Sequence, residues 1–177
     1  MTPTFKPIGS NELVPMTRRY PNLPKKVLQR DSKITKRIMM AWDVDGDPEK
    51  VLAIFLKERR MLSHERYWEL MRSVWIIAGS VENSELFRKL MQANRRSQFF
   101  FSTPEEAKKL RELPDTFKVF RATNDSADGG LSWTLSKQYA EHYKQEFDKE
   151  MIVMRKVNKS DVFAYIERNN ESEIIIL

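Results

Sequence analysis

The chain has 177 residues, 41% of them hydrophobic and 11% aromatic, which is enough for one folded domain with a modest extension. The absence of cysteine excludes disulfide bonds, thiolate metal sites and a cysteine nucleophile. No apolar run approaches the roughly 20 residues that span a bilayer, and residues 1–13 lack the layout of a signal peptide. We therefore expect a soluble, cytoplasmic protein without membrane contact.

The net charge of +6 arises in a basic, proline-rich N-terminal arm, residues 1–40. This stretch holds nine lysines and arginines against two acidic residues, whereas residues 41–177 are close to neutral. Five prolines within residues 1–30 predict an extended chain and not a long helix. Such an arm suits contact with nucleic acid or with an acidic protein surface, and a solvated terminus is the alternative.

Residues 41–114 predict a helical segment. Asp47 stands before a proline, which is typical of a helix start, and Ser63 can cap the next helix. A third helix is expected over residues 84–93. A fourth begins at Thr103, which predicts a capping box.

We expect no metal site. The acidic run 43–47 lacks calcium-loop spacing, because an EF-hand register begun at Asp43 places Pro48 where glycine is required. A turn followed by a helix cap is the better interpretation. The two histidines, His64 and His142, lie in separate predicted helices without evident metal partners.

Residues 115–177 change to a strand-rich pattern. Apolar and β-branched runs predict strands over residues 117–122, 130–134, 151–157, 161–167 and 171–177, with a helix from Ser136 to Phe147 after the second. Helices followed by strands indicate an α+β fold, and the short turns before the last two strands indicate antiparallel neighbours. We expect residues 41–177 to form one domain.

Three motifs follow one another in this C-terminal third. The first strand ends in Arg121, the second carries Ser132-Trp133-Thr134, and the last begins with Glu171-Ser172-Glu173 before aliphatic residues. This order resembles the arginine–serine–glutamate class of ADP-ribosyltransferases, over roughly residues 115–177. The resemblance implies an ADP-ribosyltransferase-like split β-sheet core, with the helical segment packed on it, that cleaves NAD⁺.

The resemblance assigns catalytic roles to four side chains. Glu173 would stabilise positive charge on the ribose as nicotinamide leaves, and Arg121 would hold the pyrophosphate or the nicotinamide-side ribose. Ser132, on the same strand face as Thr134, would hold the rotamer of Glu173. A glutamate at Glu171 goes with arginine acceptors in similar enzymes, although it can also simply end a turn.

The expected NAD⁺-binding residues are Arg121, Ala122, Gly130, Ser132, Trp133, Thr134 and Tyr143. Ala122 stands where the family often has glycine, and Thr134 replaces the commoner second serine. Gly130 would allow close approach of the backbone to the ligand. Trp133 is expected to point into the core. Tyr139 or Tyr143 could stack on the nicotinamide, and a core position is the favoured interpretation of Tyr143.

The leading hypothesis is a mono-ADP-ribosyltransferase that modifies a host or cellular protein, including nucleic-acid-associated machinery. Its small size and basic arm resemble bacteriophage or bacterial effectors, so the expected compartment is the cytoplasm of a bacterial or phage-infected cell. One alternative is an NAD⁺ glycohydrolase toxin, with water as acceptor. Another is a catalytically silent copy of the fold that binds and blocks a partner, which the intact Arg121, Ser132 and Glu173 set argues against.

Overall fold

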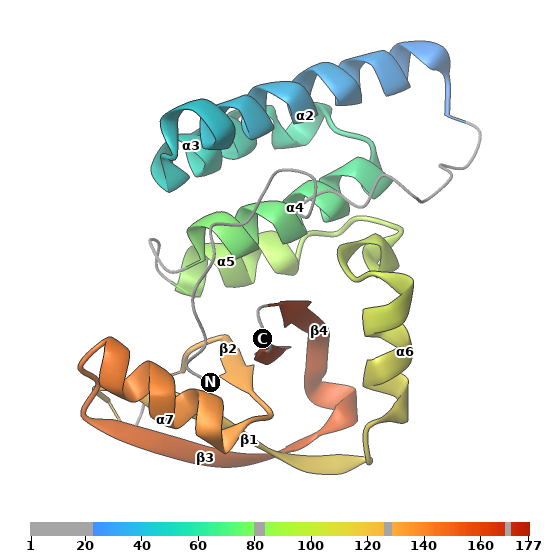
Figure 1. Cartoon of the computed structure of the whole chain (residues 1–177). Coiled ribbons are helices and arrows are strands. Elements are labelled where there is room, and N and C mark those ends of the chain that lie inside the picture. The colour runs from blue at the N-terminus through green and yellow to red at the C-terminus, as the bar shows by residue number, and fades with distance from the viewer. Residues whose placement is uncertain (1–22, 80–83, 126–128, 169–170) are drawn as a thin grey trace. The chain divides into compact units, whose positions relative to one another are not determined.

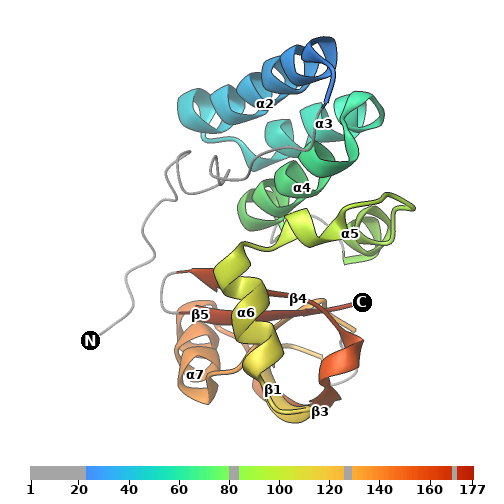
Figure 2. The same cartoon turned by 90° about the vertical axis from the view of Figure 1, so that its right-hand side faces the viewer.

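The computed structural model describes residues 23–79, 84–125, 129–168 and 171–177. Over these residues it has six α-helices and a five-stranded antiparallel sheet, an α+β architecture as expected (Figures 1 and 2). The chain divides into two compact units after Phe101. The sequence had placed this boundary at residue 114 within one domain, so helix α6 belongs with the sheet and not with the helices before it.

The first unit is helical. Its elements are α2 (Lys25–Asp45), α3 (Pro48–Glu58), the 3₁₀ turn η1 (Arg59–Met61), α4 (His64–Ala78), α5 (Ser84–Met91) and the 3₁₀ turn η2 (Gln98–Phe101). Helix α4 supplies much of the core, with Tyr67, Trp68, Leu70 and Met71 almost fully buried. The Tyr67 hydroxyl donates to the carbonyl of Leu90 at 2.8 Å, so the buried phenol is satisfied.

Helix α2 corrects the expectation of an extended arm over residues 1–30, because it begins at Lys25. Pro24 precedes the first turn and acts as a helix start, a position where its missing N–H costs nothing. Ile34, Ile38 and Ala41 recur at helical spacing and are buried. Much of the basic charge of this stretch therefore lies on an exposed helix face, and the rest of the predicted arm, residues 1–22, lies outside the described residues.

The acidic run before α3 forms the predicted turn and cap. Gly46 ends α2 in the left-handed conformation, with φ of 59°. The Asp47 side chain then accepts from the backbone N–H of Lys50 at 3.1 Å. Ser63 caps α4 in the same manner through the N–H of Arg66.

The second unit contains the sheet. Its elements are α6 (Pro104–Glu112), β1 (Thr116–Thr123), β2 (Ser132–Thr134), α7 (Lys137–Glu146), β3 (Met151–Asn158), the 3₁₀ turn η3 (Lys159–Asp161), β4 (Val162–Arg168) and β5 (Glu171–Ile176). The capping box of α6 is present, since Thr103 Oγ1 accepts from the N–H of Glu106 at 3.1 Å and Glu106 Oε2 accepts from the N–H of Thr103 at 2.7 Å. The bounds of the five strands and of α7 lie within two residues of those expected from the sequence pattern.

The strand order is β3-β1-β2-β5-β4, with every neighbouring pair antiparallel. Strands β1 and β3 pair along their whole length, from Thr116 opposite Asn158 to Thr123 opposite Met151. The register between β1 and β2 is given by Phe120 opposite Thr134. The five strands thus form one connected sheet, where a split sheet was expected. The pairing between β1 and β2 is much shorter than that between β1 and β3.

One helix covers each face of the sheet. Leu110 of α6 packs against a core cluster that includes Trp133 and Ile174, so the expectation that Trp133 points into the core is confirmed. Helix α7 lies beside β1, β2 and β3 (Figure 1). Its Tyr139 forms a hydrogen bond with Glu171, which lies on the opposite face of the sheet from Ile174.

Within the described residues, no helix has the length and apolar character needed to cross a membrane.

Candidate functional site

Strand pairing brings the predicted serine and glutamate together. Thr134 on β2 lies opposite Glu173 on β5, and Ser132 lies opposite Ile175. The Ser132 hydroxyl donates to Glu173 Oε1 at 2.6 Å. Glu173 is 1% exposed, so this bond fixes a buried carboxylate on the face that Ser132 and Thr134 share.

Arg121 is held against the backbone of the same strand. Its Nη1 donates to the carbonyl oxygen of Ser132 at 2.8 Å. A Cβ added at Gly130 would lie 2.3 Å from the Arg121 Cζ, so only glycine leaves room for the guanidinium there. The sequence had suggested that Gly130 lets a ligand approach, but the neighbour occupying that space is Arg121.

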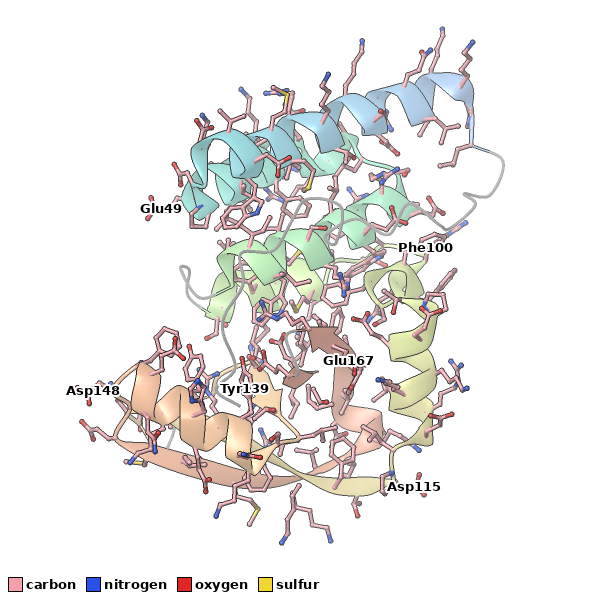
Figure 3. All side chains as sticks on the ribbon, viewed as in Figure 1. Glu49, Phe100, Asp115, Tyr139, Asp148 and Glu167 are labelled. Atoms are coloured by element: carbon pink, nitrogen blue, oxygen red, sulfur yellow. The ribbon has the colours of Figure 1, made fainter. Side chains whose placement is uncertain are left out.

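Glu171 and Glu173 lie two positions apart on β5, and both are buried. Burial, aided by the negative charge of Glu173, raises the pKa of Glu171 to about 7, although Arg168 and a hydrogen bond with Tyr139 work against this rise. Tyr139 projects from α7 (Figure 3), and burial raises the pKa of its phenol far above the ordinary value. The phenol therefore stays protonated and serves as the hydrogen-bond donor to Glu171.

The residue that sequence reasoning missed is Arg168, the last residue of β4. Its Nη2 lies 3.5 Å from Glu173 Oε2, and its Nε lies 3.8 Å from Glu171 Oε2. Burial works to lower the pKa of Arg168, but the charges of Glu173 and Glu171 outweigh it and the pKa is raised. Arg168 lies directly opposite Glu171 in the β4–β5 register, so a cross-strand charge pair was the signal that could have found it.

The other predicted residues surround this group in different ways. Ala122 is buried beside Arg121. The Trp133 ring lies in the core, and its Nε1 donates to the carbonyl of Gly130 at 2.8 Å, so only its backbone borders the Ser132 face. Thr134 is 4% exposed, and its Oγ1 accepts from the N–H of Ser136 at 3.2 Å.

Tyr143 is half-buried on α7, and its ring centroid lies 4.3 Å from that of Phe147. Burial raises the pKa of Tyr143, and the positive charge of Arg121 opposes that rise. Tyr143 therefore lies within electrostatic reach of Arg121, which is compatible with either of the two roles expected for it.

The carboxylate cluster, defined as Ser132, Tyr139, Arg168, Glu171 and Glu173, joins an oriented anion to a second carboxyl group that can exchange a proton near neutral pH. With Arg121 beside it, this chemistry fits a substrate that carries phosphates and develops positive charge as a bond breaks.

Hollows of about 530 and 310 Å³ lie along α2 in the helical unit, and no residue of the carboxylate cluster lines either of them.

Comparison with known proteins finds no match to the chain among protein-family models, curated proteins or solved structures.

Proposed function

We propose that the protein is a mono-ADP-ribosyltransferase that cleaves NAD⁺ and transfers ADP-ribose to a protein side chain. One observation carries the proposal: the Ser132 hydroxyl holds the buried Glu173 carboxylate at 2.6 Å, and the carbonyl of the same serine holds Arg121. Three residue types far apart in the sequence thus meet at one short strand.

Glu173 supplies the electrostatic part of the reaction. When the nicotinamide–ribose bond breaks, positive charge develops on the ribose, as in glycoside cleavage. A carboxylate oriented beforehand, in a place that excludes water, stabilises this charge more in the transition state than in the ground state. Ser132 keeps the rotamer of Glu173, so little reorganisation is needed at the moment of reaction.

Arg121 supplies binding. A guanidinium is charged at every physiological pH and offers several N–H donors in one plane, which suits phosphate oxygens. Because Nη1 is engaged with the Ser132 carbonyl, the planar group has a defined orientation beside β2. The guanidinium of this half-buried side chain is the group that would meet the pyrophosphate.

Glu171 suits the transfer step. A base works best when its pKa lies near the working pH, and the pKa of Glu171 is raised to about 7. An attacking side chain must lose a proton as it bonds to the ribose. Glu171 stands two residues from Glu173 on the same strand face and can receive that proton.

The test is incubation of the protein with labelled NAD⁺ and a bacterial lysate, in parallel with Glu173→Gln. The variant keeps the shape and removes the charge, so kcat for nicotinamide release should fall by about 10²–10³-fold. Glu167→Gln is the matched control and should leave activity unchanged, because Glu167, labelled in Figure 3, has an exposed side chain that pairs with Lys109 and touches no residue of the carboxylate cluster.

A labelled protein band that disappears in Glu173→Gln supports transfer. Nicotinamide release without any labelled protein would instead identify an NAD⁺ glycohydrolase. Wild-type turnover in Glu173→Gln would show that Glu173 is not the catalytic carboxylate.

A further inference from the structure

Arg168 places a guanidinium against the two carboxylates of the cluster. Its Nη2 is 3.5 Å from Glu173 Oε2, whereas the Ser132 hydroxyl donates to the other carboxylate oxygen, Oε1. Its Nε faces Glu171 Oε2 at 3.8 Å. A guanidinium, which becomes a nitrogen nucleophile when it gives up a proton, therefore lies beside the group proposed to stabilise the reacting ribose.

The β4–β5 hairpin holds Arg168 in this position. Arg168 pairs in register with Glu171, and the rest of β4 pairs with β5 back to Val162 opposite Ile176. The side chain is 30% exposed, so it is confined by its neighbours and still open to solvent. A nucleophile held in place in this way reacts with an advantage that a dissolved acceptor lacks, because its translational and rotational freedom is already lost.

We propose that Arg168 is a modification site, an internal acceptor to which the protein transfers ADP-ribose from NAD⁺. This inference rests on the proposed function, since it uses the same carboxylates. A purely structural role, in which Arg168 only compensates the charge of two buried glutamates, is the competing explanation that the experiment must separate.

The step is balanced as follows. The bond between the ribose C1′ and the nicotinamide nitrogen breaks, and nicotinamide leaves with the electron pair. A nitrogen of the Arg168 guanidinium forms the new bond to C1′ and loses one proton, which passes to Glu171 and then to solvent. The product is an ADP-ribosylated Arg168 that remains a cation, together with neutral nicotinamide and one proton.

Other arginines of the sheet unit lie in different surroundings. Arg121 is bound to the Ser132 carbonyl, and Arg155 lies 6.0 Å from the Trp133 ring, on the core face of the sheet. Arg111, at the end of α6, has an exposed side chain. The contacts with the carboxylates thus single out Arg168 as the acceptor and Arg111 as a reference site.

The experiment incubates the full-length protein with NAD⁺, without other proteins, and maps ADP-ribose by peptide mass spectrometry while nicotinamide release is followed. We expect label at Arg168, absent in Glu173→Gln and in Arg168→Lys, and retained at the wild-type level in Arg111→Lys. The fraction labelled per unit time should stay constant over about tenfold dilution of the protein, because the reaction is intramolecular. When wild-type protein is mixed with an excess of Glu173→Gln protein, which keeps Arg168, the variant should remain unlabelled, because the wild type modifies only its own Arg168.

Three results would overturn the inference. Release of nicotinamide with an unmodified Arg168 peptide would leave the proposed function standing and reduce Arg168 to a structural cation. Label at Arg168 in Glu173→Gln, or with free ADP-ribose in place of NAD⁺, would show uncatalysed chemistry. No nicotinamide release at all would remove the proposed function and this inference together.

Discussion

Replacement of Gly130 by alanine would test the role of Arg121 without altering Arg121 itself. The new Cβ would lie 2.3 Å from Cζ and 2.4 Å from Nε of Arg121, so the guanidinium must move. The clashing atoms end a flexible, half-exposed side chain that can turn aside, so the loss in free energy of unfolding should be limited to the broken hydrogen bond to Ser132, at most about 1.5–3 kcal/mol.

The displaced guanidinium loses its 2.8 Å hydrogen bond to Ser132 and, with it, the orientation proposed for binding the substrate phosphates. A charge-assisted hydrogen bond between the guanidinium and a substrate phosphate would contribute about 1.5–3 kcal/mol to binding. The KM for NAD⁺ should therefore rise by about 10- to 150-fold, since each 1.4 kcal/mol is about tenfold.

The assay is steady-state nicotinamide release at varied NAD⁺, with urea unfolding in parallel. Gly129→Ala is the matched control, because a Cβ there meets nothing within 4 Å, and KM should not change. In the Arg121→Ala background, Gly130→Ala should add no further loss, because the group that it displaces is gone. If Gly130→Ala kept the wild-type KM while Arg121→Ala was impaired, the position assigned to the guanidinium would be wrong.

Three further predictions concern other bonds of the sheet unit. Ser132→Ala removes the 2.6 Å hydrogen bond to Glu173 and should lower kcat by about 10- to 100-fold. Ser172→Ala is the control and should not lower kcat, because the Ser172 hydroxyl accepts from Tyr165 on the other face of the sheet. Equal kcat in both variants would refute the positioning role of Ser132. Because burial raises the pKa of Glu171 from 4.5 to about 7, its contribution to stability is full below pH 4.5 and is lost as pH rises through 7. The unfolding free energy of the wild type relative to Glu171→Gln should then fall between pH 4.5 and 8 by about 2–3 kcal/mol, and a flat difference would contradict the raised pKa. Thr103→Ala removes the α6 cap and should cost about 0.5–2 kcal/mol in urea unfolding, with NAD⁺ turnover at low urea preserved.

The strand pattern predicted most of the sheet unit because its signals are local. Ser136 and Thr103 mark helix starts through short-range caps, and the apolar run after Glu173 is too short for a helix and is typical of a buried strand. Helix α2 was missed because prolines dominate the stretch before it, although Ile34, Ile38 and Ala41 already carried the helical period. There the last proline begins a helix and does not prevent one.

The site was predictable in part. The pairing of Ser132 with Glu173 follows from strand parity, once β2 and β5 are neighbours. The position of Arg168 depends on the β4–β5 register, and the space at Gly130 depends on the rotamer of Arg121. Neither can be derived from a motif, because both are set by contacts across the sheet.

Strand parity also explains how one short motif can provide two different carboxyl groups. Glu171 and Glu173 share a face of β5, so sequence spacing alone makes them equivalent. Their neighbours separate them, since Glu173 accepts from the Ser132 hydroxyl while Glu171 is buried beside the charge of Glu173 with Tyr139 as its donor. An anion fixed by a hydroxyl suits stabilisation of positive charge, and a carboxyl group that titrates near pH 7 suits proton transfer. The two different roles proposed for Glu171 and Glu173 therefore depend on β2 and α7, which supply the two hydrogen-bond donors, and not on the motif itself.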